Sequence, residues 1–434
     1  MIDDGGWFFS IFEPRSSILG GSLPIARAPA VMTGQPANFA AFLRDQHNHI
    51  FGRPWPVIPS ALVIAALNVF LFAYDKPWTA SDGLRNWGDS LFHWLGFIDQ
   101  PDLLPPLLYS GSVLNIGLLL GGLVAALLSR EFAVRPAPGA ELVKGALGGL
   151  LMGAGAMLSF GCNIGGFFSA LAALSASGLA MMAGLILGAF IGTRYLIREN
   201  GKVIKSGRLP FMSTCEAPPR PAGGSAAFKL QPRFGVVVFA LVLGGGCLYQ
   251  FLGHGKLAVF LYFGVLFGIV FQRSRFCLVN AFREPFLSGA SEHARAAALA
   301  LIMSLIGFAI LKVTDLKDAT EWVFPSFWLG ALTGGILFGI GMVLAGGCGA
   351  GSIWRVGEGH VKLWIAVAFF AVGTSAMRLL LTRTELIRQL GTPVFLPDLF
   401  GWAGAVGVVV VLMIVWYLLA AWNQEKKQVG VLKF

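Results

Sequence analysis

Two segments of the chain share a pattern of glycines around a cysteine, and these residue types could bind a soft anion. The second segment follows the first by 186 residues, and nine positions in an ungapped window of eighteen are identical. Besides the pair Leu151 and Leu337, the identical positions are Gly148, Gly149, Gly153, Gly155, Leu158, Gly161, Cys162 and Gly165 in the first segment and Gly334, Gly335, Gly339, Gly341, Leu344, Gly347, Cys348 and Gly351 in the second. Glycines let the backbone approach a solute, and a thiol adds a polarizable atom with a weak donor.

The repeated glycine–cysteine pair suits a sulfur- or selenium-containing anion better than sulfate or phosphate, which call for arginine or many hard donors. Where a membrane helix breaks, its exposed N–H groups form an anion site beside the thiol. A lone membrane cysteine more often serves as a small apolar residue in tight packing, but the repetition favours a binding role. The candidate site residues are therefore the two cysteines and their neighbours, Gly161, Cys162, Gly165, Gly347, Cys348 and Gly351.

A third candidate, Cys277, lies in an arginine-rich segment. Arg273 and Arg275 precede it and Arg283 follows it, in a stretch predicted at the cytoplasmic surface. Arginine near a thiol could lower the thiol pKa or draw an anion toward the exit. For Arg273 and Arg275, anchoring of a helix end is an equally good interpretation. Arg283 and Glu284 could simply form an interfacial ion pair.

The remaining polar candidates carry less information. Arg355 and Glu358 could form a pair within the membrane near the pathway or lie in a solvated loop, and His360 is more typical of a loop histidine than of a ligand. Cys247 has no counterpart in the other half, which favours packing, and Cys215 is incidental. Because the five cysteines form neither a zinc-type pair nor a secreted disulfide pattern, free thiols are expected, with no metal and no cofactor.

The elements that must position these residues are membrane-spanning helices. Of the 434 residues, 56% are hydrophobic and 12% charged, which is typical of a polytopic membrane protein. The apolar stretches lie at about 57–74, 111–128, 145–160, 178–197, 234–252, 256–271, 296–313, 328–346, 361–380 and 402–421. A span needs about 20 residues, so the shortest stretches indicate half-helices or re-entrant segments. We expect an all-α integral protein of the lipid bilayer with nine or ten crossings.

The net charge of +10 is better explained by membrane orientation than by nucleic-acid binding. Basic residues gather in a Pro/Gly-rich central linker and in the tail, and the positive-inside rule places both in the cytoplasm. The expected location is the inner membrane of a bacterial cell. The N-terminus lacks the succession of basic, apolar and small residues that marks a signal peptide, so none is expected.

The linker divides the chain into two membrane halves. The predicted parts are an N-terminal cytoplasmic or interfacial segment (1–56), a first membrane half (57–197), the linker (198–233), a second membrane half (234–421) and a cytoplasmic tail (422–434). Counting crossings from the linker and the tail directs the span before Cys162 outward and the span before Cys348 inward. The halves are therefore predicted to be inverted around a central pathway.

The halves also differ. Segment 117–132 resembles segment 264–277, which makes Cys277 the pseudo-equivalent of a place in the first half without a cysteine. The span at 296–313 is expected to be additional in the second half.

At these motifs the chain resembles the YeeE/YedE family of bacterial sulfur-transport membrane proteins. The matching stretches are Gly161–Phe168, Arg275–Cys277 with Ala281–Arg283, and Leu344–Cys348 with Arg355, Glu358 and Gly359. The likeness covers about 57–421 and is closest to the longer YedE branch, for which a role in selenium handling has been suggested. It implies an hourglass-shaped molecule whose thiols, Cys162 and Cys348 among them, pass thiosulfate along by S–H···S contacts. It also implies a small TusA-like sulfur-carrier protein as a partner.

The sequence thus predicts a transporter for the uptake of a small sulfur oxyanion, thiosulfate first, and not an enzyme. Motifs for nucleotide hydrolysis or nucleophilic catalysis are missing from it. Because the first half lacks the early cysteine of thiosulfate transporters, a selenium compound is the close alternative. A membrane thiol or persulfide-transfer oxidoreductase and a scaffold with inert cysteines are the other classes. In the transport interpretation, Cys162 and Cys348 rank above Cys277.

Overall fold

The computed structural model describes residues 39–205 and 226–426, which form helices joined by loops. The helices are α1 (Phe39–Phe51), α2 (Val57–Tyr74), α3 (Ala80–Trp94), α4 (Ser110–Leu128), α5 (Gly139–Leu158), η1 (Asn163–Ser169), α6 (Ala170–Ala172), α7 (Ala176–Lys205), α8 (Ala226–Phe251), α9 (Gly255–Ser274), α10 (Leu278–Leu287), α11 (Glu292–Val313), α12 (Leu329–Ala345), α13 (Gly349–Gly357), α14 (Val361–Arg383), η2 (Leu386–Gln389) and α15 (Leu396–Lys426). Four parts of the predicted organisation lie outside the described residues: most of the N-terminal segment, the middle of the linker, Cys215 within it, and most of the tail.

Ten of the described helices are long and apolar enough to cross a membrane, so the predicted all-α polytopic fold is confirmed. The chain divides into two compact units, Met1–His47 and Asn48–Phe434, and all ten helices belong to the second. The domain boundaries predicted from the linker remain a proposal about the chain's organisation.

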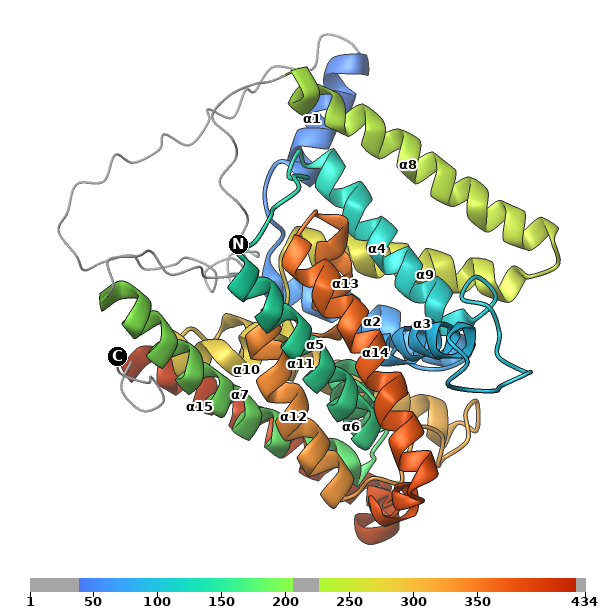
Figure 1. The fold of residues 1–434 in the computed structure, drawn as a ribbon, viewed down its shortest axis with the longest axis vertical. Helices are drawn as coiled ribbons and strands as arrows, with labels where there is room; N and C mark the ends of the chain where they lie inside the picture. Colours follow the sequence, from blue (N-terminus) through green and yellow to red (C-terminus); the bar gives the residue numbers. More distant parts are fainter. Residues whose placement is uncertain (1–38, 206–225, 427–434) are drawn as a thin grey trace, which may run out of the picture. The chain divides into compact units, whose positions relative to one another are not determined.

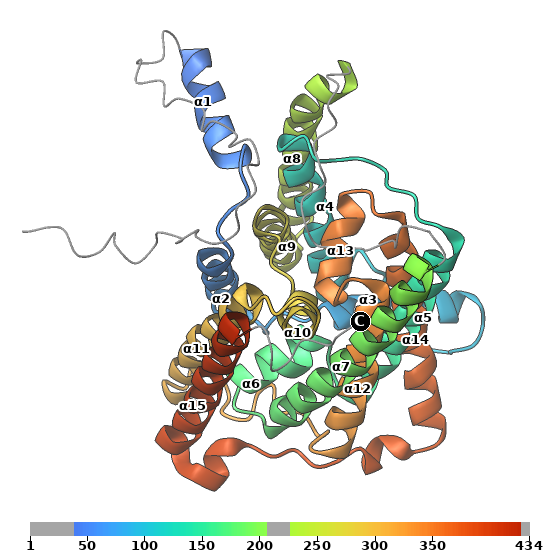
Figure 2. The same ribbon diagram turned by 90° about the vertical axis from the view of Figure 1, so that its left-hand side faces the viewer.

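Short helices interrupt the series of spans, as expected, but they are not the shortest apolar stretches, 145–160 and 256–271, which belong to the full-length helices α5 and α9. The short helices are α3, η1 with α6, α10 and α13, and in Figure 2 α3, α10 and α13 lie in the middle of the second unit. The chain reverses before three of them at residues with positive φ, Phe160 (58°), Arg275 (58°) and Gly346 (78°). A left-handed residue ends a helix because the hydrogen-bond ladder cannot continue through it.

The two glycine–cysteine segments pack against each other through their helices α5 and α12. In the repeat, Gly148 corresponds to Gly334 and Gly155 to Gly341. In space the backbones cross-contact instead: a Cβ on Gly148 would lie 2.7 Å from the carbonyl oxygen of Gly341, and one on Gly155 would lie 2.5 Å from that of Gly334. Gly148 therefore contacts the counterpart of Gly155, and Gly155 contacts the counterpart of Gly148. This pattern arises when a two-fold axis relates two antiparallel helices. The predicted inversion of the halves is confirmed.

The neighbouring helices obey the same symmetry. Helices α14, α5, α12 and α7 lie side by side in that order (Figure 1). A Cβ on Gly149 of α5 would lie 2.3 Å from the carbonyl oxygen of Ala366 in α14, and one on Gly184 of α7 would lie 2.3 Å from that of Leu332 in α12. Close approach of this kind requires glycine and lets helix backbones touch within a membrane. On the outer parts of the unit, α2 packs on α11 as α9 packs on α4.

This pairing assigns each element of one half a counterpart in the other. Helices α2, α3, α4, α5, η1–α6 and α7 correspond to α9, α10, α11, α12, α13 and α14. The expectation that the span at 296–313 is additional is therefore wrong, because α11 is the counterpart of α4. Of the described membrane-spanning helices, α8 and α15 have no counterpart in this pairing. We call the membrane face where α7 ends and α8 begins the linker face, and the face where α2 ends and α4 begins the far face.

Candidate functional site

Each of the three motif cysteines lies at the N-cap of a short helix. Cys162 precedes η1, Cys277 precedes α10 and Cys348 precedes α13, while Thr79 holds the same position before α3. The first N–H groups of a helix lack partners within the helix, and the helix dipole makes this end positive. Two of the short helices, α3 and η1, follow spans that end at the far face, and two, α10 and α13, follow spans that end at the linker face.

The four N-caps meet in the interior. Thr79 Oγ1 lies 3.6 Å from Cys162 Sγ, and the Cys162 backbone N–H donates to Ser81 Oγ at 2.9 Å. On the other side of this contact, a Cβ on Gly349 would lie 3.5 Å from the Cβ atoms of both Cys162 and Ala80. The first turn of α13 therefore touches the first residues of α3 and η1, so N-termini that enter from opposite faces converge.

The thiols of Cys277 and Cys348 lie on either side of Gly351. A Cβ on Gly351 would be 3.1 Å from Cys348 Sγ and 3.2 Å from Cys277 Sγ. Cys348 Sγ accepts a hydrogen bond from the Gly351 N–H at 3.3 Å, and the two thiols are themselves hydrogen-bonded. All three motif cysteines are buried, and none of them forms a disulfide bond within the described residues. The absence of a side chain at Gly351 thus leaves the two sulfur atoms facing one gap.

The side-chain amide of Asn163 lies in the same interior. Its side chain is fully buried, and apart from the Cys348 thiol beside it neither the amide oxygen nor the amide nitrogen has a hydrogen-bond partner among the described residues. A buried polar group without a partner costs about 1–3 kcal/mol, so such groups are rare unless a ligand completes them. Sequence reasoning did not single out Asn163. The repeat itself could have indicated this residue, because Asn163 in the first segment corresponds to Gly349 in the second.

A second internal repeat was also missed. Thr79-Ala80-Ser81-Asp82-Gly83-Leu84-Arg85 and Cys277-Leu278-Val279-Asn280-Ala281-Phe282-Arg283 occupy corresponding helices, α3 and α10. Each has an arginine six residues after the N-cap, and Arg85 binds Asp82 as Arg283 binds Asn280. The counterpart of Cys277 is therefore Thr79, and the prediction that placed it at segment 129–132 is wrong. The segments compared there belong to α4 and α9, which pack on each other through Gly117 and Gly264.

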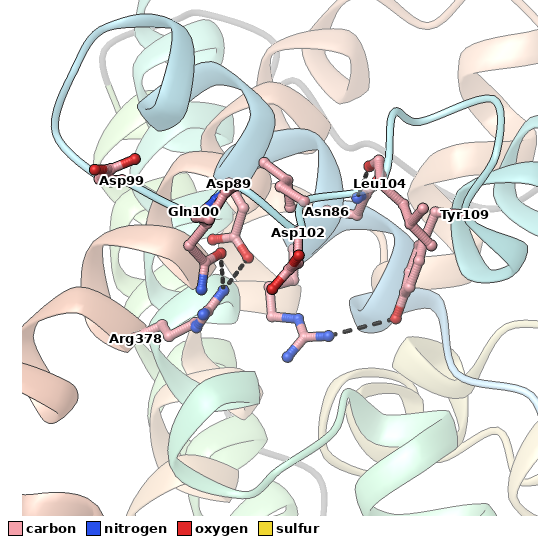
Figure 3. Close-up of a pocket in the computed structure, with 11 residues that line it drawn as sticks. Asn86, Asp89, Asp99, Gln100, Asp102, Leu104, Tyr109 and Arg378 are labelled. Carbon is pink, nitrogen blue, oxygen red and sulfur yellow. Dashed lines mark hydrogen bonds and ion pairs between the residues drawn. The ribbon is translucent and has the colours of Figure 1, made fainter.

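Beyond Thr79, two hollows open toward the far face. The outer one, of about 480 Å³, lies among Asn86, Asp89, Gln100, Tyr109 and Arg378, and Figure 3 shows Arg378 directed at Asp89 and Gln100. The inner one, of about 270 Å³, reaches Thr79, Ser81 and Gly161. The second hollow thus ends at the hydroxyl groups that touch Cys162.

Comparison with known proteins agrees with this geometry. The model of a family described as sulphur transport matches residues 17–191 and 273–432, which together make up more than half of the chain. The chain belongs to the sulphur-transport family. It is similar to the probable transporter YedE of Escherichia coli (strain K12), with 26% identity over 321 residues, 71% of this chain and 77% of the relative. It is also similar to the thiosulfate transporter TsuA of the same organism, with 38% identity over 115 residues, 26% of this chain and 32% of the relative.

A second thiosulfate transporter TsuA, from Spirochaeta thermophila, is 39% identical over 115 residues, 26% of this chain and 34% of that protein. The predicted family resemblance is confirmed. Together with the ten apolar helices, the family and these relatives support a multi-pass membrane transporter of sulfur-containing solute and not an enzyme.

In this member of the sulphur-transport family, the arginines around Cys277 do not anchor a helix end at the surface. Arg275 is buried and donates to Glu131 at 2.5 Å and to Glu358 at 2.7 Å. Gln272 donates to both carboxylates at 2.9 Å, and Arg273 lies 3.4 Å from Glu131. The surface interpretation of Arg273 and Arg275 is therefore wrong. The ends of α9 and α13 and the loop after α4 share one buried charged cluster on the linker face.

The other predicted charged residues lie around this cluster. Glu358 is fully buried; burial favours its neutral form, but Arg275, His360 and Gln272 lower its pKa to about 2. Arg355 donates to the carbonyl oxygen of Gly346 at 2.9 Å, which ties α13 to the end of α12. The alternative that Glu358 lies in a solvated loop is wrong, because its side chain is enclosed by the cluster.

Two further predictions concern residues away from the N-caps. Arg283 forms the expected ion pair with Glu284, at 2.7 Å, and also contacts Asn280. Cys247 is exposed on α8, where its sulfur lies 3.9 Å from the Tyr262 hydroxyl. Within the described residues the packing interpretation of Cys247 is therefore wrong, since its side chain is exposed there.

Proposed function

We propose that the chain takes up a small sulfur oxyanion, thiosulfate first, through the site at which the four helix N-termini converge. The observation that carries this proposal is that three thiols and the buried Asn163 amide, whose one partner among the described residues is the Cys348 thiol, meet at positive helix ends. Thiosulfate combines charged oxygens with one exposed soft sulfur. Backbone N–H groups and the Asn163 amide suit the oxygens, and thiols suit the sulfur.

The arrangement supports a pathway and not a permanent binding site. Cys162 contacts Thr79 from the far face, and Cys348 and Cys277 share the gap at Gly351 on the linker side of the same interior. Each thiol is a weak donor, so an anion handed from one to the next is held without being trapped. Cys162, Cys277 and Cys348, with Gly161, Gly165, Gly347 and Gly351, are the residues proposed to line it. The buried charged residues Arg355 and Glu358, and Arg283, are proposed to shape its linker end.

The proposed orientation places the linker face in the cytoplasm of a bacterial inner membrane. It is supported by the basic residues that gather at the end of α7, in the segment that follows it, at the start of α8 and near the C-terminus. Cys215 belongs to the segment that joins these two helices. A membrane-impermeant thiol reagent should therefore leave Cys215 unlabelled in intact cells and label it in inverted membrane vesicles. Labelling of Cys215 from outside would reverse the orientation and with it the direction of uptake.

Growth on a single sulfur source tests the substrate. A bacterial strain without its own thiosulfate uptake should grow on thiosulfate as sole sulfur source when it carries this chain, and should not grow with the empty vector. Selenium compounds remain the second substrate class. The reason is that the first half lacks the early cysteine of thiosulfate transporters and has Thr79 at the position that corresponds to Cys277. Failure to support growth, together with unchanged selenium incorporation, would remove both substrates. A TusA-like sulfur carrier at the cytoplasmic face is proposed as the acceptor of the imported sulfur.

One observation favours a second function, a thiol or persulfide-transfer oxidoreductase. The hydrogen-bonded thiols of Cys277 and Cys348 are neighbours, as two cysteines that form a transient bridge must be. Intact mass of the purified protein under oxidising and reducing conditions separates the two functions. A loss of two hydrogens, or a gain of one sulfur after incubation with thiosulfate, supports covalent chemistry. An unchanged mass supports conduction.

A further inference from the structure

The inner hollow on the far face is lined by four side chains that bind one another, those of Lys76, Asp82, Arg85 and Tyr109. The Asp82 carboxylate receives Lys76 at 2.8 Å, Arg85 at 2.9 Å and the Tyr109 hydroxyl at 2.6 Å. Lys76 also lies over the Tyr109 ring, 5.3 Å from its centre. Burial would raise the pKa of Asp82, but Lys76 and Arg85 keep the pKa below its usual value, so the carboxylate stays ionised. Two cations and a phenol thus converge on a single carboxylate.

Two of these side chains also connect the inner hollow to the outer one. Arg85 and Tyr109 line both hollows, and the Arg85 guanidinium lies 3.4 Å from the Tyr109 hydroxyl. The Arg85 side chain retains about a third of its exposure to solvent, whereas Asp82 retains 17%. The other charged pair nearby, Arg378 with Asp89, belongs to the outer hollow alone. Arg85 and Tyr109 therefore lie at the boundary between the two hollows.

The inner end of the hollow consists of hydroxyl groups that contact the first thiol. Thr79 and Ser81 lie 2.9 Å apart, and they bind the sulfur and the backbone N–H of Cys162. The hollow is therefore lined both by two basic side chains and by the hydroxyl groups that contact Cys162. Basic side chains beside neutral donors suit the capture of an anion that is later released.

We propose that this hollow is an anion antechamber, in which an incoming oxyanion displaces Asp82 from Lys76 and Arg85 before it reaches Cys162. Asp82 is a built-in counter-ion: while the hollow is empty its carboxylate offsets one of the two positive charges, and once an anion is bound the carboxylate repels the anion toward the thiols. The fold does not require a carboxylate here, because the corresponding residue of α10 is Asn280. This inference rests on the proposed function, since it describes the approach to the same thiols.

Uptake kinetics with three variants test the antechamber. Arg85→Gln should raise the half-saturating thiosulfate concentration at least about tenfold, because a charge-assisted contact is lost, and Arg85→Lys should recover part of it. Asp82→Asn should lower the half-saturating concentration and also the maximal rate, since the anion is no longer repelled. Inorganic sulfate should inhibit wild-type uptake competitively, and Asp82→Asn should make it the stronger inhibitor.

Lys256→Gln is the matched control, because Lys256 forms an exposed ion pair with Asp75 at 2.5 Å and lines neither hollow. Its kinetics should match wild type. Unchanged half-saturation in both Arg85→Gln and Asp82→Asn, at normal membrane abundance, would overturn the inference. If Arg85→Gln fails to reach the membrane, Asp82→Asn alone decides, since an asparagine is already accommodated at the corresponding position.

A binding measurement separates this inference from the proposed function. Purified Cys162→Ala protein in detergent should still bind thiosulfate or sulfate, detected as a thermal shift against a chloride control of equal ionic strength, and Arg85→Gln should remove that shift. Binding that persists in the Cys162→Ala, Arg85→Gln double variant would contradict the antechamber and leave the thiol pathway untouched. Normal uptake by Cys162→Ala would contradict the thiol pathway, whatever the antechamber binds.

Discussion

Replacing Cys162 or Cys348 with alanine should lower thiosulfate uptake at least about tenfold. Each replacement removes the sulfur from a helix N-cap, and with it one of the proposed contacts for the anion. The loss of one hydrogen bond to a charged group is worth about 1.5–3 kcal/mol, which corresponds to a tenfold or larger change. Uptake of radiolabelled thiosulfate by whole cells, normalised to membrane abundance, measures the effect.

The other cysteines provide graded comparisons. Cys277→Ala should cause a partial to large loss, because its thiol shares the gap at Gly351 with Cys348. Cys247→Ala and Cys215→Ala should leave uptake near normal, and Cys247 is the better control since it is exposed on α8. Equal losses in all five variants would point to damage from cysteine replacement in general and not to a pathway.

Gly351→Ala should block the pathway without removing any thiol. The added methyl group would lie 3.1 Å from Cys348 Sγ and 3.2 Å from Cys277 Sγ, so it would fill the gap that the two sulfur atoms face. Because alanine favours helix over glycine, α13 itself should be no less stable. Uptake should fall about tenfold, the scale expected for overpacking of 1–3 kcal/mol.

Gly349→Ala is the matched control on the same helical turn. Its methyl group would lie 3.3 Å or more from every neighbour, including Phe370 and Cys162, so only a small adjustment is needed. Uptake by this variant should stay within about twofold of wild type. A loss in Gly349→Ala as large as that in Gly351→Ala would show that any added bulk in α13 is harmful, and the gap between the thiols would lose its special role.

The sequence was sufficient to predict the membrane helices and their inverted duplication. Long apolar stretches identify spans regardless of tertiary context, and the repeat of Gly148–Gly165 at Gly334–Gly351 has a physical cause, since the same glycines bring α5 and α12 into backbone contact. The cysteines were found for the same reason. A rare residue repeated in register stands out even without knowledge of its neighbours.

The partners of those cysteines could not be predicted in the same way. Thr79 differs in type from its counterpart Cys277, so the repeat that relates them is visible only once α3 and α10 are seen to correspond. The burial of Arg275 follows from Glu131 and Glu358, which lie far away in the sequence and meet it only in the folded chain. Charge near a helix end predicts surface anchoring unless such long-range partners are known. Asp82 and Arg85 were overlooked because α3 is too polar to be recognised as a membrane element.

Uptake of radiolabelled thiosulfate into proteoliposomes tests the central claim most directly. The comparison is between purified wild-type protein and the Cys162→Ala, Cys348→Ala double variant, reconstituted at equal amounts and checked for equal orientation. The account predicts accumulation by the wild type and, for the double variant, no more uptake than protein-free liposomes show. Uptake by the double variant at the wild-type rate would contradict it, and would leave the thiols as packing residues among the glycines.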